Sequence, residues 1–301
     1  MKRELGLLVT SACNYRCGFC HHEGISFPED ELLSAEDYLF LYDVFNELYP
    51  NDSLTITGGE PLVRSDIEEI LKTFKEHSVK ITLVTNGSLI LKNIETISRY
   101  VNRVNVSLHS LNSDLYRGIT GTNKNALVLV QEGLKELRKN SPAIDIRLNV
   151  TFVKNVNDNL NAIQDLVDFA NTLNASIKFI ELYPNSDEMF VPLNVLSSFL
   201  DTLGYKKYSK DDRQILFYKN EQQVTLTQIF CAYSEQIKSR SAFCKEKQDL
   251  FITPSGKIKT CMNRNSGVFI GQDILNLDSM MLKFNILKAI NLFGNCSLYG
   301  K

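Results

Sequence analysis

Residues 13–20 read CNYRCGFC and follow an apolar run at residues 5–10. The thiols of Cys13, Cys17 and Cys20 have the spacing C-x3-C-x2-C, with an aromatic residue before the last cysteine. Three thiolates this close in sequence can ligate three irons of a four-iron, four-sulfur cluster. Ordinary ferredoxin-type clusters recruit a fourth cysteine, so the fourth iron here would be open to a substrate or a cofactor.

Zinc is the alternative metal for this loop. Zinc prefers four closed ligands, and His21 or His22 could supply the one that the three cysteines leave out. A third interpretation is that the cysteines are simply buried and bind no metal. The cluster with an open iron is favoured over both, because later segments of the chain match it.

Composition limits the class of protein. With 301 residues, the chain can form one large α/β domain and an appendage. Its 33 basic and 35 acidic residues nearly cancel, which argues against bulk nucleic-acid binding. No apolar run is long enough to span a bilayer, and no signal peptide precedes the first strand. Seven cysteines in such a chain predict metal or redox chemistry in the cytoplasm, where disulfides are rare.

Strand-like and helix-like segments alternate through about residue 182. The predicted strands are Leu5–Thr10, Ser53–Thr57, Lys80–Thr85, Arg103–Ser107, Asp145–Phe152 and Ser176–Glu181. Most are short, apolar and rich in β-branched residues, as in a parallel sheet buried on both faces. Six such repeats predict an α/β fold, a partial (β/α)6 barrel over residues 1–185, because a full eight-fold barrel needs about 250 residues. In such sheets the chemistry gathers at the C-terminal ends of the strands.

The sequence also predicts where helices begin and which helices and strands follow in the second half of the chain. Ser34 and Ser65 each begin a segment that resembles a capping box. Predicted helices cover Asn123–Lys139, Asn157–Leu173, Val191–Leu203 and Met280–Leu292, weak strands cover Gln214–Tyr218 and Gln223–Leu226, and a hairpin joins Leu250–Ile252 to Lys257–Thr260.

The second strand ends in Gly58-Gly59-Glu60-Pro61. Together with the cysteine loop, this segment resembles the radical S-adenosylmethionine (SAM) superfamily. The resemblance implies that Cys13, Cys17 and Cys20 are the catalytic ligands of a [4Fe-4S] cluster whose open iron chelates SAM. It also implies that an electron donor such as flavodoxin or ferredoxin reduces the cluster. The 5′-deoxyadenosyl radical released from SAM would then abstract a hydrogen atom from the substrate.

The same resemblance implies a set of SAM contacts. These are Phe19, Gly58, Gly59, Glu60, Ser107, Arg147 and Tyr183. Arg147 faces a barrel interior and so needs an anionic partner, which is either SAM, the substrate or a neighbouring acid. His109 stands where many relatives carry aspartate, and we predict that it is a structural hydrogen-bonding residue.

Within the superfamily, the chain resembles the GTP 3′,8-cyclases of molybdenum-cofactor biosynthesis almost from end to end. The shared-looking segments are Cys13–His22, Thr57–Leu62, Val106–Ser110, Ile119–Gly121, Val153–Asn157, Ile177–Pro184 and Cys244–Arg264. Residues 186–301 resemble a small α+β auxiliary-cluster module of the twitch or SPASM type. Cys231, Cys244 and Cys261 could form a rearranged three-ligand site for a second cluster, or they are buried free cysteines.

Several positions depart from the cyclase pattern. Lys247 stands at the middle ligand of the second cluster, and a lysine cation has no lone pair to offer a metal. Positions of four GTP-binding arginines hold Gly6, Thr55, Asp249 and Phe251, and a threonine position holds Val84. Each charge-assisted bond to a triphosphate contributes about 1.5–3 kcal/mol, so these losses would remove most of the affinity.

The leading hypothesis is therefore a radical SAM enzyme acting on another small molecule, such as a different nucleotide or nucleoside. The alternatives are the GTP cyclase itself and a peptide-modifying radical SAM enzyme. A non-catalytic iron–sulfur scaffold is disfavoured because a scaffold needs no Gly58-Gly59-Glu60-Pro61 segment.

Overall fold

The computed structural model describes residues 3–20, 28–182, 188–209, 214–228, 249–259 and 267–292. The strands are β1 (Leu5–Leu8), β2 (Ser53–Thr57), β3 (Lys80–Thr85), β4 (Arg103–Ser107), β5 (Asp145–Phe152), β6 (Ser176–Glu181), β7 (Lys206–Ser209), β8 (Gln214–Lys219), β9 (Gln222–Thr227), β10 (Leu250–Ile252), β11 (Lys257–Lys259) and β12 (Gly267–Phe269). The α-helices are α1 (Ala35–Leu48), α2 (Ile67–Glu76), α3 (Ile94–Tyr100), α4 (Ser113–Thr120), α5 (Ala126–Asn140), α6 (Leu160–Thr172), α7 (Leu193–Thr202), α9 (Gly271–Leu275) and α10 (Ser279–Leu292). None of these helices is long and apolar enough to cross a membrane.

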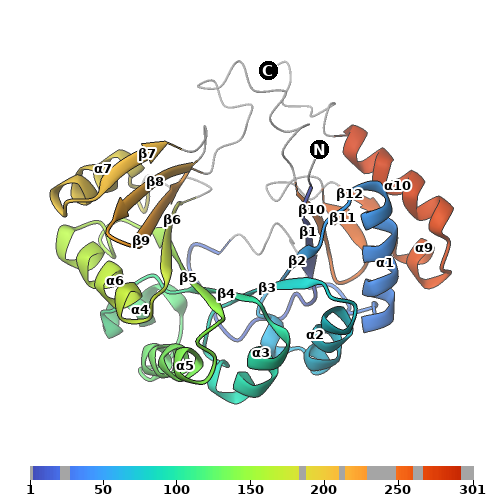
Figure 1. Ribbon diagram of the computed structural model, residues 1–301, viewed down its shortest axis with the longest axis horizontal. Helices are drawn as coiled ribbons and strands as arrows, with labels where there is room; N and C mark the ends of the chain where they lie inside the picture. The colour runs from blue at the N-terminus through green and yellow to red at the C-terminus, as the bar shows by residue number, and fades with distance from the viewer. Residues whose placement is uncertain are drawn as a thin grey trace.

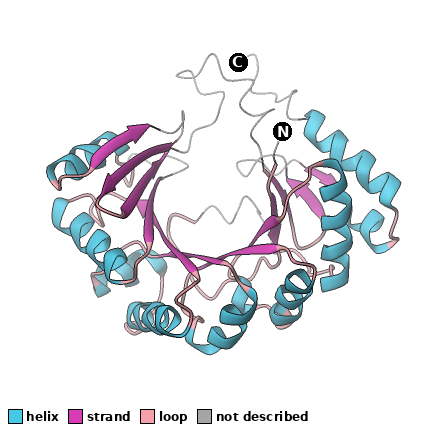
Figure 2. Cartoon of the chain, in the orientation of Figure 1, coloured by secondary structure: helices cyan, strands magenta, loops and turns pink. Residues whose placement is uncertain are grey.

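The described strands form a single curved sheet in the order β12-β11-β10-β1-β2-β3-β4-β5-β6-β9-β8-β7. The six strands from β1 to β6 are parallel neighbours in chain order. Figure 1 shows the sheet as an open arc with the helices on its convex side, and Figure 2 shows the same separation of strands and helices by colour. The predicted partial barrel is confirmed.

The alternation of side chains along each strand separates the core from the inner face. On β5, every second side chain from Ile146 to Phe152 is fully buried and belongs to the core. Phe74 on α2 is a fully buried residue of the same core. The intervening side chains, Arg147 and Asn149 among them, lie on the inner, concave face. Because the core uses one face of the sheet, the other is left for polar side chains.

The strands after residue 186 extend this sheet at both edges. The antiparallel strands β7, β8 and β9 join the β6 edge, and the antiparallel strands β10, β11 and β12 join the β1 edge. The described part of the C-terminal region is therefore continuous with the barrel sheet. A separate twitch or SPASM module is not confirmed, and the boundary between residues 185 and 186 stays a prediction.

Most local predictions are confirmed. The bounds of β2 to β6 are the predicted ones, whereas β1 ends at Leu8 instead of Thr10. The capping box at Ser34 forms, with Ser34 and Asp37 exchanging hydrogen bonds. The capping box at Ser65 was predicted wrongly, because Asp66 is the N-cap of α2 and its carboxylate binds the Arg64 guanidinium instead of a helix N–H.

We predict that Ser34→Ala lowers the free energy of unfolding by about 1 kcal/mol, since it leaves helix N–H groups without an acceptor. Thermal or denaturant unfolding measures this loss. Ser65→Ala is the matched control and should be neutral, because Ser65 is exposed and does not cap α2. Equal losses in the two variants would contradict the assignment.

Candidate active site at the cysteine loop

The cysteine loop lies directly against the turn that follows β2. The backbone N–H of Gly59 donates to the carbonyl of Thr10, and the N–H of Glu60 donates to that of Ala12, each at 2.8 Å. A Cβ atom on Gly59 would overlap the Ala12 carbonyl, and Gly58 has a φ of +149°. Glycine is required at both positions because the two backbones approach so closely.

The C-terminal end of α4 supports the middle of the loop. The N–H of Arg16 donates to the carbonyl of Thr120 at 3.0 Å, and the N–H of Gly18 donates to that of Ile119 at 2.9 Å. Gly121 ends the helix with a φ of +63°, and a Cβ atom there would lie 2.7 Å from the carbonyl oxygen of Arg16. The Ile119–Gly121 segment, which the sequence showed only as a family likeness, thus holds the loop in place.

The turn after β3 supplies side-chain contacts to the loop. The Asn86 amide donates to Oδ1 of Asn14 at 2.8 Å and lies 4.0 Å from Sγ of Cys13. The Asn14 amide in turn donates to the Ser88 hydroxyl at 2.9 Å. Asparagine and glycine are common in turns, so sequence gave no reason to single out Asn86.

Glu60 has its carboxylate inside the protein and not on the surface of the site. The side chain is 0% exposed, and its oxygens accept from the N–H of Leu62, the hydroxyl of Thr85 and the N–H of Asn86. Burial raises the pKa of Glu60 to about 7. The carboxylate therefore braces the turns after β2 and β3 against each other, and any contact with SAM would come from the backbone.

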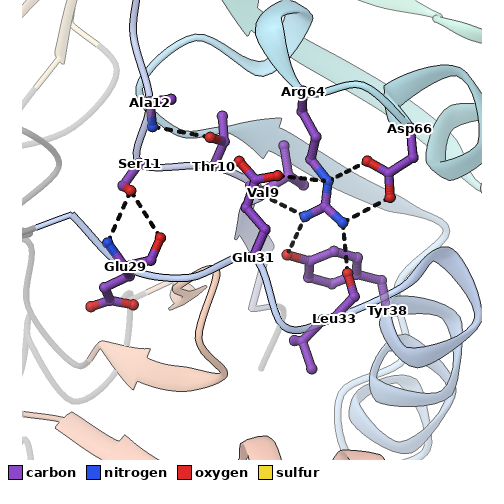
Figure 3. A network of polar contacts seen from close by, with 10 residues as sticks. All are labelled: Val9, Thr10, Ser11, Ala12, Glu29, Glu31, Leu33, Tyr38, Arg64 and Asp66. Carbon is purple, nitrogen blue, oxygen red and sulfur yellow. Dashed lines mark hydrogen bonds and ion pairs between the residues drawn. The ribbon is translucent and has the colours of Figure 1, made fainter.

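A second set of contacts closes the base of the loop. The hydroxyl of Ser11 accepts from the N–H of Glu29 at 3.0 Å and donates to the Glu29 carbonyl at 3.1 Å (Figure 3). The Glu29 carboxylate accepts from the N–H and the hydroxyl of Ser255, in the turn between β10 and β11. This contact ties the base of the cysteine loop to the C-terminal hairpin.

Arg64 is the centre of the network in Figure 3. Its side chain is 3% exposed and forms a bidentate ion pair with the Asp66 carboxylate. It also donates to the carbonyl of Val9 at 2.6 Å and to that of Leu33 at 2.7 Å. Arg64 therefore fixes the end of β1, from which the cysteine loop starts, to the segment that leads into α1.

The three thiols of the loop differ in how far they are exposed. Cys13 and Cys20 are exposed and Cys17 is partly buried. Burial, reinforced by the charges of Cys20 and Cys13, raises the pKa of Cys17 to about 12, so a positive metal centre is needed to hold the thiolates. In the part of the chain that the structure describes, no three cysteine, histidine or acidic side chains converge on one metal-ion position.

Phe19 and His109 lie beside the thiols. Their rings pack edge to face, with centroids 4.8 Å apart. The Nδ1 atom of His109 accepts from the N–H of Thr151 at 3.1 Å, and burial lowers the pKa of His109 to about 4. The imidazole is neutral at physiological pH, and it makes a structural hydrogen bond as predicted.

The other predicted site residues fall into two groups. Ser107 and Arg147 lie on the inner face, where Ser107 pairs with Asn149 and Arg147 with Asn105 in the strand register. Burial lowers the pKa of Arg147, and Arg103 adds to that effect. Several predicted residues lie outside the described ranges, namely His21, His22, Tyr183, Cys231, Cys244, Lys247 and Cys261.

The positions that depart from the cyclase pattern are neighbours in space. Phe251, Gly6 and Thr55 form one row across β10, β1 and β2. The Phe251 ring occupies the place where a side chain on Gly6 would begin. An aromatic ring and a glycine thus form a packed pair at two positions where the cyclase resemblance predicts arginines.

The family model described as the radical SAM superfamily matches residues 7–170, more than half of the chain. The chain belongs to the radical SAM superfamily. The probable GTP 3′,8-cyclase of Pyrobaculum aerophilum is 32% identical to it over 96% of this chain and 93% of that protein. The probable GTP 3′,8-cyclase of Thermococcus kodakarensis is 33% identical over 87% of this chain and 85% of that protein.

Among solved structures, Streptococcus suis SuiB bound to S-adenosylmethionine matches with a TM-score of 0.66. The match covers 100% of this chain and 67% of that chain at 16% identity, so it bears on the fold alone. As a radical SAM enzyme of the same type as the archaeal relatives, this protein uses a [4Fe-4S] cluster and SAM. The exposed thiols and the close turn at Gly58 and Gly59 fit these two groups.

We predict that Gly59→Ala weakens SAM binding at least about tenfold, because the added methyl group forces the turn away from Ala12. Equilibrium dialysis with the cluster-loaded protein gives the dissociation constant, and the iron content shows whether the cluster is still held. Gly18→Ala is the matched control, since a Cβ atom there meets nothing within 4 Å. If the two variants bind SAM equally well, the close approach is not needed for the site.

A second prediction concerns the pH dependence of stability. The pKa of Glu60 is raised from 4.5 to about 7 on folding, so the folded chain holds this proton more tightly than the unfolded chain. Glu60 therefore contributes stability below pH 4.5 that is lost as the pH rises through 7.

Glu60→Gln stays neutral but places an amide N–H against the N–H of Asn86, which should destabilise the protein by about 1–3 kcal/mol. The gap between the melting temperatures of wild type and variant should be larger at pH 5 than at pH 8. A gap that does not change over this range would mean that Glu60 titrates normally.

Proposed function

We propose that this chain is a GTP 3′,8-cyclase, the activity named for its archaeal relatives. The observation that carries the proposal is the match to the Pyrobaculum aerophilum protein over 93% of that protein's length. The sequence-based hypothesis of a substrate other than GTP is less well supported than this alternative.

The residues of the cysteine loop and of the turn after β2 would bind the cluster and SAM. Cys13, Cys17 and Cys20 would hold the cluster, and the backbone of Gly58 and Gly59 would receive the amino group of SAM. When bound and reduced, these groups supply a radical that abstracts a hydrogen atom from the substrate. Phe19 would pack against the adenine, with the neutral His109 ring fixing its orientation.

The inner face would receive the substrate. Arg147 is a cation on this face at a position where the cyclase pattern has lysine, and it would bind an anionic or polar group of the nucleotide. Ser107 is the last residue of β4, and it would contact SAM. Flavodoxin or ferredoxin would supply the electron. A second cluster on Cys231, Cys244 and Cys261 stays a prediction.

A second candidate function rests on the row formed by Phe251, Gly6 and Thr55. The Phe251 ring fills space that two arginine side chains would otherwise enter. An apolar ring cannot replace the charge-assisted bonds that a triphosphate requires. This favours a related enzyme that acts on a nucleotide or nucleoside with fewer phosphate contacts. Modification of a peptide is the third hypothesis, and no described contact supports it.

One experiment separates these candidates. The anaerobically reconstituted protein is given SAM and dithionite with and without GTP, and both 5′-deoxyadenosine and GTP-derived products are analysed. We expect deoxyadenosine together with a cyclised GTP product.

Deoxyadenosine with unchanged GTP would reject the cyclase and favour the second candidate. A variant with alanine at Cys13, Cys17 and Cys20 is the control and should form no deoxyadenosine. No deoxyadenosine from wild type would reject every radical SAM activity proposed for the chain.

A further inference from the structure

The inner face of β4, β5 and β9 carries buried polar atoms that have no hydrogen-bond partner among the described residues. They are Oδ1 of Asn105, Nε of Arg147, Oδ1 of Asn149 and Oγ1 of Thr227. Asn105 is 3% exposed and Thr227 is 8% exposed. A buried polar atom without a partner costs about 1–3 kcal/mol, and native proteins contain few of them. Their position on one face indicates that a bound molecule supplies the missing partners.

Three of these atoms belong to neighbouring side chains. Asn105 lies beside Arg147 across the β4–β5 pair, and Asn149 follows Arg147 by two residues on the same face of β5. Asn149 also lies beside Ser107, the last residue of β4. The three side chains are thus neighbours on β4 and β5, and Arg147 and Asn105 lie deeper in the barrel than Asn149.

The three atoms differ in the hydrogen bonds that they can form. The amide oxygens of Asn105 and Asn149 only accept hydrogen bonds, whereas Nε of Arg147 only donates. Ionised phosphate and carboxylate groups carry no donors, so they could satisfy Arg147 but would leave both amide oxygens unpaired in the orientation that the two amides have here. A vicinal diol has two O–H donors, and its oxygens also accept. It can therefore satisfy all three atoms at once.

We propose that Asn105 and Asn149 bind the two ribose hydroxyls of the substrate, with Arg147 donating to a hydroxyl oxygen. The proposal rests on the proposed function insofar as it takes the substrate to be a nucleotide or nucleoside. SAM also contains a ribose, but it lies with the cysteine loop and Gly58–Gly59 at the strand ends. Asn105 is two residues deeper than Ser107, about 6–7 Å further into the barrel, whereas Asn149 lies at the level of Ser107. The affinity for SAM is therefore measured beside that for the nucleotides.

The test compares ligands that differ by one hydroxyl group. Calorimetry on the full-length, cluster-loaded protein gives dissociation constants for GTP, 2′-deoxy-GTP and 3′-deoxy-GTP, and separately for SAM. We expect wild type to bind GTP about tenfold more tightly than either deoxy analogue. Asn105→Ala and Asn149→Ala should each bind GTP about as weakly as one of the analogues. Their affinity for that analogue should be nearly unchanged.

Asn157→Ala is the matched control. Asn157 is an equally buried asparagine, but its amide is fully bonded to Val153, His109 and Thr151 within the protein. Its loss should leave the preference for GTP over the deoxy analogues intact, even if the protein is less stable. A loss of preference in all three variants would show a general structural effect and overturn the proposal.

The other possible binding results also decide for or against the proposal. Equal weakening of GTP and both analogues in the Asn105 and Asn149 variants overturns the proposal. Loss of SAM affinity with an unchanged preference among the GTP analogues would assign the diol site to SAM and overturn it too. If wild type does not bind GTP but binds another ribonucleotide or ribonucleoside better than its deoxy form, the diol site is supported and the cyclase function is rejected. Binding of no such ligand overturns both.

Discussion

The close approach of two backbones, residues 10–12 after β1 and Gly58–Glu60 after β2, is the constraint on which the rest of the site depends. Two direct hydrogen bonds join them, and no side chain fits between Gly59 and Ala12. Neighbouring parallel strands bring their C-terminal ends to one edge of the sheet, which makes this meeting possible. The thiols on one side and the glycine backbone on the other are then held at a fixed separation.

Several parts of the chain maintain that separation. The carboxylate of Glu60 joins the turns after β2 and β3, and Arg64 fastens the end of β1 to the segment before α1. Glu29 links the base of the cysteine loop to the C-terminal hairpin through Ser11 and Ser255. These are buried or partly buried polar contacts, so losing one partner would leave another unpaired. The loop that carries the cysteines is consequently held in place from the barrel and from the C-terminal region.

The two faces of the sheet differ in how freely their side chains can vary. The outward side chains of each strand form the core and have little freedom to vary. The inward side chains carry no core packing, so arginines expected near β10, β1 and β2 can give way to Phe251, Gly6 and Thr55. On the opposite part of the same face, Asn105, Arg147 and Asn149 retain polar atoms that the described residues do not satisfy. With the function and the diol site proposed above, substrate recognition and radical formation would be separated along the strands.

The sequence by itself determined the parallel strands, the cysteine loop and the family, because periodicity and short motifs are local properties. Five of the six barrel strands have the predicted bounds. The spacing of Cys13, Cys17 and Cys20 predicted a cluster once it was combined with the Gly58-Gly59-Glu60-Pro61 segment. Only the tertiary structure placed β7–β9 and β10–β12 at opposite edges of one sheet, because both pairings join residues that are far apart in the chain. It also decided that the buried Glu60 carboxylate joins two turns and that Asp66, not Ser65, is the N-cap of α2. Likewise, only the strand pairing places Asn105 beside Arg147. These roles depend on which groups meet across strands, and a linear pattern carries no information about that.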